Sequence, residues 1–225
     1  MKTRFVPGFL LLTFTCMLLS LPAVAGSILY TNGPVNGNND AWNMSGPYAV
    51  SDSFGLASAS TVTSIAFGVW VFAGDTPTSV MWSITSAPGG GTVYGSGTAS
   101  LTNILFCHAG ASCGLGQADV YTSSFATNVA LGSGTYWLNF QGGTSSLFNA
   151  LYWDENDGVG CSGTGCPSAA FQTFTGTIPS ESFTLSTSIP IPEPEGTMVL
   201  FGGGIFTFAG ILVRRLRTRS ASPLA

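Results

Sequence analysis

The chain of 225 residues lacks positive charge through almost its whole length. Its six Lys and Arg residues all lie near the two ends, and none occurs between residues 5 and 213. Nucleic-acid-binding domains need cations against phosphate, and a P-loop nucleotide site needs its lysine. We therefore expect no nucleic-acid partner and no phosphate-clamp chemistry.

Charge of either sign is scarce. Only 7% of the residues are charged, against about 25% in typical soluble domains. The chain is nevertheless 45% hydrophobic and 12% aromatic, which argues against a disordered polyelectrolyte. A folded domain with an uncharged, hydroxyl-rich surface is the expectation.

The N-terminal residues have the three parts of a secretory signal. A positive start is followed by an apolar run and then by a small-x-small pattern. These parts are Lys2 and Arg4, residues 9–21, and Ala23-Val24-Ala25. The pattern predicts a signal peptide over residues 1–25, cleaved before Gly26, and export of the chain.

The C-terminal end has the parts of a membrane anchor. The uncharged run of residues 196–213 would span about 27 Å as a helix, close to the ~30 Å of a bilayer core. Four arginines follow this run: Arg214, Arg215, Arg217 and Arg219. By the positive-inside rule the arginines should stay cytoplasmic, which leaves the body of the chain outside.

Pro192, Glu193 and Pro194 precede this apolar run. The order of a Pro-Glu-Pro motif, a glycine-containing membrane segment and an arginine-rich end resembles the PEP-CTERM sorting signal of exported bacterial proteins, over residues 190–219. The resemblance implies recognition by an exosortase, a membrane-embedded cysteine transpeptidase. It also implies delivery to the cell surface or to an exopolysaccharide matrix.

Between the two ends, residues 26–189 form one domain by size. This body has eight acidic residues and no Lys or Arg, so its formal charge is −8. The acidic residues are Asp40, Asp52, Asp75, Asp119, Asp154, Glu155, Asp157 and Glu181.

Short alternating segments separated by Gly-rich turns dominate the body, and no stretch has helical periodicity. The expected strands are residues 28–31, 48–56, 62–72, 80–85, 92–101, 120–125, 135–140, 147–153 and 183–185. This pattern predicts an all-β fold, a jelly-roll-like β-sandwich of about eight or nine strands.

The body also resembles, more loosely, the sandwich domains that accompany such tails. The shared segments are Phe67-Gly68-Val69-Trp70, Gly134–Leu138 and Trp153-Asp154. This resemblance implies a fold and brings no catalytic residues with it.

Four cysteines remain after removal of the signal. In an exported chain they predict two disulfides, and proximity in sequence favours Cys107–Cys113 and Cys161–Cys166. Two alternatives involve His108: a metal–thiolate site, and a cysteine–histidine nucleophile. The spacings fit zinc poorly, and neighbouring residues on a strand point to opposite faces.

The acidic segment after residue 153 is the candidate cation site. Asp154, Asn156 and Asp157 could offer oxygen ligands to Ca²⁺, although the spacing is not that of an EF-hand and a solvated turn is the simpler reading. Otherwise we expect no cofactor.

Three functions are compatible with the sequence. The main expectation is an exported, non-catalytic protein of the cell surface or biofilm matrix. The first alternative is a carbohydrate-binding module, with Trp70 and Trp137 as stacking residues because both are out of phase with the apolar face of their strands. The remote alternative is a glycoside hydrolase, which would need two carboxylates from Asp154, Glu155, Asp157 and Glu181.

Overall fold

The computed structural model describes residues 26–110 and 113–188. These residues belong to one compact unit, Gly26–Ile189. The predicted signal peptide, Pro-Glu-Pro motif, membrane segment and arginine cluster lie outside the described residues. Within the described part, no helix has the length and apolarity to cross a membrane.

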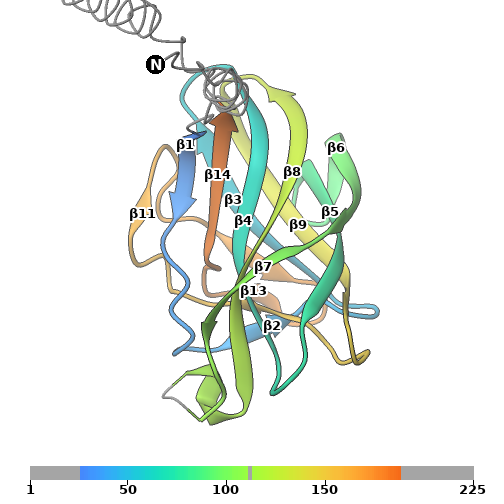
Figure 1. The fold of residues 1–225 in the computed structure, drawn as a ribbon. Helices are drawn as coiled ribbons and strands as arrows, with labels where there is room; N and C mark the ends of the chain where they lie inside the picture. Colours follow the sequence, from blue (N-terminus) through green and yellow to red (C-terminus); the bar gives the residue numbers. More distant parts are fainter. Residues whose placement is uncertain (1–25, 111–112, 189–225) are drawn as a thin grey trace, which may run out of the picture. The chain divides into compact units, whose positions relative to one another are not determined.

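The domain consists of two antiparallel sheets, drawn as two layers of strands in Figure 1. The eight-stranded sheet contains β1 (Gly26–Asn32), β2 (Ala41–Asn43), β4 (Ser60–Phe72), β7 (Thr102–Cys107), β8 (Ala118–Leu131), β10 (Tyr152–Asp154), β11 (Cys161–Ser162) and β14 (Phe183–Ser188). The six-stranded sheet contains β3 (Ala49–Leu56), β5 (Pro77–Ala87), β6 (Gly90–Ser100), β9 (Gly134–Ser145), β12 (Ala170–Gln172) and β13 (Gly176–Ile178). A short 3-10 helix, η2 (Gly114–Gly116), precedes β8.

Strand β4 organises the eight-stranded sheet. One of its edges pairs with β8 along its whole length, from Ser60 to Phe72, and β7 follows β8. Its other edge is shared by β14 and β10. The predicted alternation holds, because Ile65, Phe67, Val69 and Val71 all point into the core.

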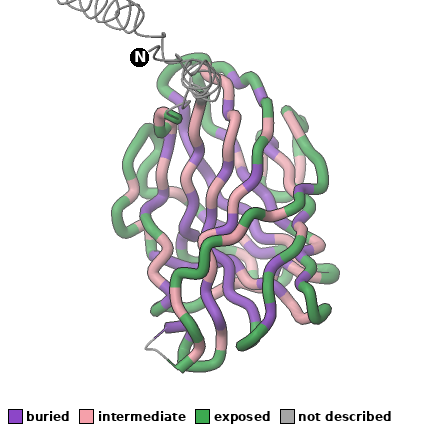
Figure 2. The backbone as a smooth tube through the Cα atoms, viewed as in Figure 1, coloured by how far each residue is buried: buried purple, intermediate pink, exposed green. Residues whose placement is uncertain are grey.

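Aromatic rings fill the space between the sheets, where Figure 2 shows the buried segments. Phe67 stacks on Phe140 of the opposite sheet at 4.2 Å between centroids, and Phe140 lies 4.5 Å from Trp153. Burial of each such side chain stabilises the fold by about 1.5–3 kcal/mol.

The structure confirms the all-β class and the two packed sheets, but residues 26–110 and 113–188 form fourteen strands rather than eight or nine. The additional strands are mostly pieces of two or three residues, too short to show a period of two. The apolar strand β7 was also missed.

The strand predicted over residues 147–153 is wrong for its first half. Leu147 and Phe148 are exposed in a turn, and strand β10 begins only at Tyr152. The turn forms because Asp75 accepts hydrogen bonds from the Leu147 amide and the Asn149 side chain, at 3.0 Å each. This long-range contact outweighs the local β preference of the segment.

Both predicted disulfides are present, Cys107–Cys113 and Cys161–Cys166. Their Cα–Cα distances of 6.2 and 5.8 Å lie within the range for cystine bridges. The first ties the end of β7 to the segment before β8. The second closes the loop that follows β11.

The Phe-Gly-x-Trp segment of β4 has a steric explanation. A Cβ added at Gly68 would lie 2.5 Å from both the Asp154 Cβ and the Ser182 Oγ. Glycine therefore lets β10 and the residues before β14 approach β4 closely, while Phe67 fills the core.

We predict that Gly68→Ala lowers the free energy of unfolding by about 1–3 kcal/mol, because the added methyl overpacks this contact. Gly90→Ala is the matched control, since a Cβ there meets nothing within 4 Å. Urea unfolding followed by tryptophan fluorescence measures both variants. Equal stability of the two variants would contradict the steric account.

Thiol counting provides a second check of the fold. We expect residues 26–189, denatured without reductant, to contain no free thiol, because all four cysteines of the body are bridged. Alkylation followed by mass spectrometry gives the number, and reduction before alkylation is the control. One or more labelled cysteines without reductant would refute the bridge assignment.

Candidate functional site

Asp154 anchors a buried polar junction at the end of β10. One of its oxygens accepts hydrogen bonds from the Trp70 indole at 2.6 Å and the Gly37 amide at 3.0 Å. The other accepts from the Asn36 amide at 3.0 Å. Burial raises the pKa of Asp154, while these hydrogen bonds oppose the rise. The carboxyl thus fastens the loop after β1 to the eight-stranded sheet.

The other two predicted calcium ligands have different partners. The buried Asn156 donates to the Asn32 carbonyl at 2.7 Å and accepts from the Gly158 amide. The exposed Asp157 accepts from Asn39 at 2.8 Å. In the described part of the chain, no three or more His, Cys, Asp or Glu side chains are grouped in a way that could hold a metal ion.

The four carboxylates considered for hydrolysis do not share an accessible cleft. Asp154 and Glu181 have no exposed surface, and Glu155 is 7% exposed and accepts from the Trp42 indole at 2.8 Å. Of the four, only Asp157 is exposed. A glycosidase pair must flank a substrate bond, so this arrangement gives the two carboxylates no common access to substrate.

The expectation that Trp70 is exposed is wrong. Trp70 does lie on the outer face of β4, as its phase predicted, but it is 5% exposed and packs against Cys113 and Val120. The covering residues come from distant segments, which the local alternation could not reveal.

Trp137 is half-buried on the outer face of the six-stranded sheet, between Ser53 of β3 and Thr85 of β5. The neighbouring Asn139 is bonded to Ser51, Thr85 and the Gly89 amide. The side-chain amide of Asn139 on this face is therefore already hydrogen-bonded within the domain.

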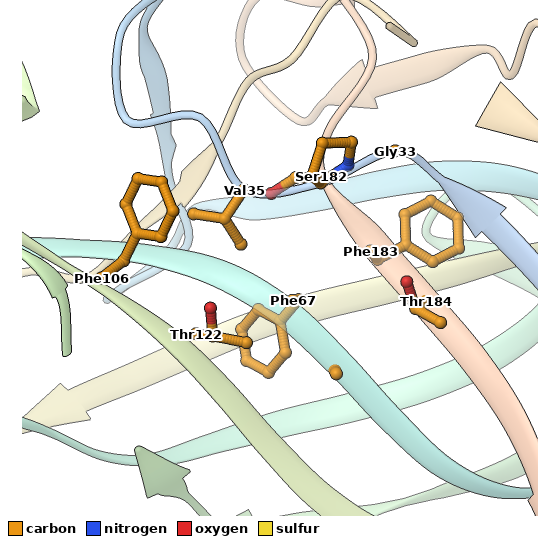
Figure 3. Close-up of a pocket in the computed structure, with 10 residues that line it drawn as sticks. Gly33, Val35, Phe67, Phe106, Thr122, Ser182, Phe183 and Thr184 are labelled. Carbon is orange, nitrogen blue, oxygen red and sulfur yellow. The ribbon is translucent and has the colours of Figure 1, made fainter. Parts of the chain in front are cut away.

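A hollow lies on the outer face of the eight-stranded sheet (Figure 3). It has a volume of about 260 Å³, slightly below the 300–1,000 Å³ of typical small-molecule sites. Phe106 of β7 and Val35 of the loop after β1 form its walls, and Thr122 and Thr184 project from β8 and β14. No charged residue lines it.

Sequence reasoning missed this hollow because it missed β7. The apolar run Ile104-Leu105-Phe106 before Cys107 was the available signal. All three side chains are substantially exposed, at 71%, 38% and 50%. Hydrophobicity alone would have assigned them to the core.

His108 is exposed, and its Nδ1 lies 3.3 Å from Asp119. Because Cys107 is bridged to Cys113, neither the metal–thiolate site nor the cysteine–histidine nucleophile forms. Burial would raise the pKa of Asp119, but the Ala109 and Gly74 amides and His108 lower it below its usual value.

Asp75 is the most heavily hydrogen-bonded carboxylate. It accepts from the Ser145 hydroxyl at 2.6 Å and from the Ser146 hydroxyl and Thr76 amide at 2.7 Å, besides Leu147 and Asn149. Burial would raise its pKa, yet these donors outweigh burial and lower the pKa well below the usual range. Asp75 thus holds the loop after β9.

The chain matches no known family model, no characterised protein and no solved structure.

We predict that Asp75→Asn destabilises the domain by about 2 kcal/mol at pH 7, because hydrogen bonds to a charged acceptor are lost. The lowered pKa of Asp75 contributes stability above pH 4 that disappears as the pH falls toward the folded-state value. The variant should therefore lose less stability than the parent in acid. Unfolding curves from pH 2 to 7 test this, with the exposed Asp40→Asn as control. Identical acid profiles for parent and Asp75→Asn would contradict the assignment.

Proposed function

We propose that this protein is an exported, non-catalytic component of the cell surface or extracellular polysaccharide matrix, delivered by an exosortase. The observation that carries the proposal is the ordered C-terminal series of Pro192-Glu193-Pro194, the apolar run and the arginine cluster. Two prolines keep the motif extended and unable to form a helix, a conformation suited to a protease cleft. The N-terminal signal supplies the export step.

The body supports a structural role in this proposal. Its two disulfides suit an oxidising compartment, and its carboxylates mostly bond to loops and strands of the domain itself. Asp75, Asp119 and Asp154 each join segments that are distant in sequence. We also propose that the strands of the two sheets follow one another in a jelly-roll order.

Mass spectrometry of the mature protein tests delivery. In a host with an active exosortase we expect the chain to begin at Gly26 and to lack the residues after the Pro-Glu-Pro motif. Replacing Pro192, Glu193 and Pro194 by alanine should leave the tail attached and the protein in the membrane fraction. Recovery of a parent chain that still ends at Ala225 would contradict exosortase processing.

Carbohydrate binding is the second candidate, and the uncharged hollow beside Phe106 favours it. An exposed aromatic edge near threonine hydroxyls suits a neutral sugar better than a charged ligand. This hollow replaces the predicted Trp70 surface, since Trp70 is buried.

Glycan-array screening of the exported protein tests this candidate. We expect binding to a neutral glycan to fall at least tenfold in Phe106→Ala, with Phe72→Ala as a control because Phe72 is similarly exposed and lies outside the hollow. Equal binding by both variants, or retention on no polysaccharide including the host's own, would eliminate it.

A further inference from the structure

Three carboxyl side chains point into the space between the sheets at one end of the sandwich. Asp52 alternates with the core residues Val50 and Phe54 along β3. Glu155 follows Trp153 by two residues, and Glu181 precedes Phe183 by two. Glu155 and Glu181 are also antiparallel bridge partners, so their side chains share one face.

Glu181 has no exposed surface, and neither of its carboxyl oxygens has a hydrogen-bond partner among the described residues. Asp52 is equally buried. One of its oxygens accepts from the Glu181 amide at 2.7 Å and from Asn32 at 3.2 Å, whereas its Oδ1 has no partner. Buried polar atoms of native proteins nearly always have a hydrogen-bond partner. The oxygens of Asp52 and Glu181 that have none therefore require another means of stabilisation.

The surroundings contain no positive side chain that could neutralise the pair. The domain between residues 26 and 188 has no Lys or Arg, and His108 interacts with Asp119. The titratable groups near Asp52 and Glu181 are Tyr30 of β1, Asp40, Asp154 at the end of β10, Glu155 and, beside Glu155, Asp157. All of them are acids.

We propose that Asp52 and Glu181 form a proton-dependent lock between the two sheets. With protons on both carboxyls, the pair stays buried. The Glu181 amide then holds residues 180–182 to Asp52 of β3. The Asn32 side chain of β1 holds the same segment by donating to the Glu181 carbonyl at 2.6 Å. Loss of the protons places two unneutralised negative charges in the interior. The segment before β14 then separates from β3.

Electrostatics supports the same conclusion. Burial raises the pKa of Asp52 to about 8, although hydrogen bonding by the Glu181 amide, the Ser168 side chain and the Ser53 amide partly opposes the rise. Burial raises the pKa of Glu181 well above its usual value, and repulsion from Asp52 and Glu155 raises it further.

The direction of the pH effect follows from proton linkage. In the unfolded chain both carboxyls lose their protons near pH 4, whereas the folded domain retains them to higher pH. The folded state therefore binds more protons, and its stability falls as the pH rises from about 4 through the folded-state values. Within this pH range, each proton that the folded state retains increases the unfolding equilibrium constant by about tenfold for each pH unit of rise.

Chemical unfolding of the exported protein between pH 5 and 9 tests the lock. We expect the parent to unfold more readily as the pH rises. In Glu181→Gln, which is neutral at every pH, the unfolding equilibrium constant should increase with pH about tenfold less per pH unit than in the parent. The variant should also be more stable than the parent at pH 8. Asp52→Asn should weaken the dependence below pH 8 as well, and the exposed Asp157→Asn is the charge-matched control.

Two results would overturn the proposal. One is a parent stability that is constant or rises from pH 5 to 8. The other is a Ca²⁺-dependent increase in the unfolding temperature at pH 7 that EDTA reverses and Glu181→Gln abolishes, because a bound cation would then neutralise the pair. Equal unfolding of the parent with Ca²⁺ and with EDTA supports the proton.

Discussion

The constraint on which this domain depends is the lack of any Lys or Arg between its sheets or on its surface. A buried carboxylate in most proteins has a cationic partner, and desolvating it without one is costly. Here the acids must be satisfied in other ways. Neutral donors surround Asp75, two backbone amides and His108 hold Asp119, and Asp52 and Glu181 depend on protons.

Hydrogen bonding and protonation of the buried carboxyl groups have different structural consequences. Asp75 gathers hydroxyl, amide and backbone donors and thereby shapes the loop after β9. Asp154 does the same for the loop after β1 and also accepts a hydrogen bond from the Trp70 indole. Asp52 and Glu181 instead lie in the interior, so their protonation decides whether that end of the sandwich stays closed.

Local alternation was sufficient to predict the long strands, because β4 and β9 bury one face along most of their length. It failed where a distant group decides the structure. Asp75 converts residues 147–149 from an expected strand into a turn, and Cys113 and Val120 cover Trp70. The paired cysteines were predictable because proximity in sequence limits the connectivity.

The candidate site was less predictable. Asp154, Asn156 and Asp157 were recognised as an acidic segment, but Trp70, Asn32 and Asn39, which bond to their side chains, lie 84 or more residues away in β4, β1 and the loop between β1 and β2. The pairing of Asp52 with Glu181 joins positions 129 residues apart. Only the register of the strands brings them together, since neither residue has a sequence signal of its own.

Hydrogen-bond donors and protons take the place of Lys and Arg around the buried carboxyl groups of this domain. Carbon-13 NMR titration of the Asp and Glu carboxyl groups tests it most directly. We expect Asp52 and Glu181 to be still protonated at pH 7, and Asp75 and Asp119 to remain ionised at pH values where an ordinary aspartate is protonated. Ionised Asp52 and Glu181 at pH 7 in the folded, metal-free domain would contradict it.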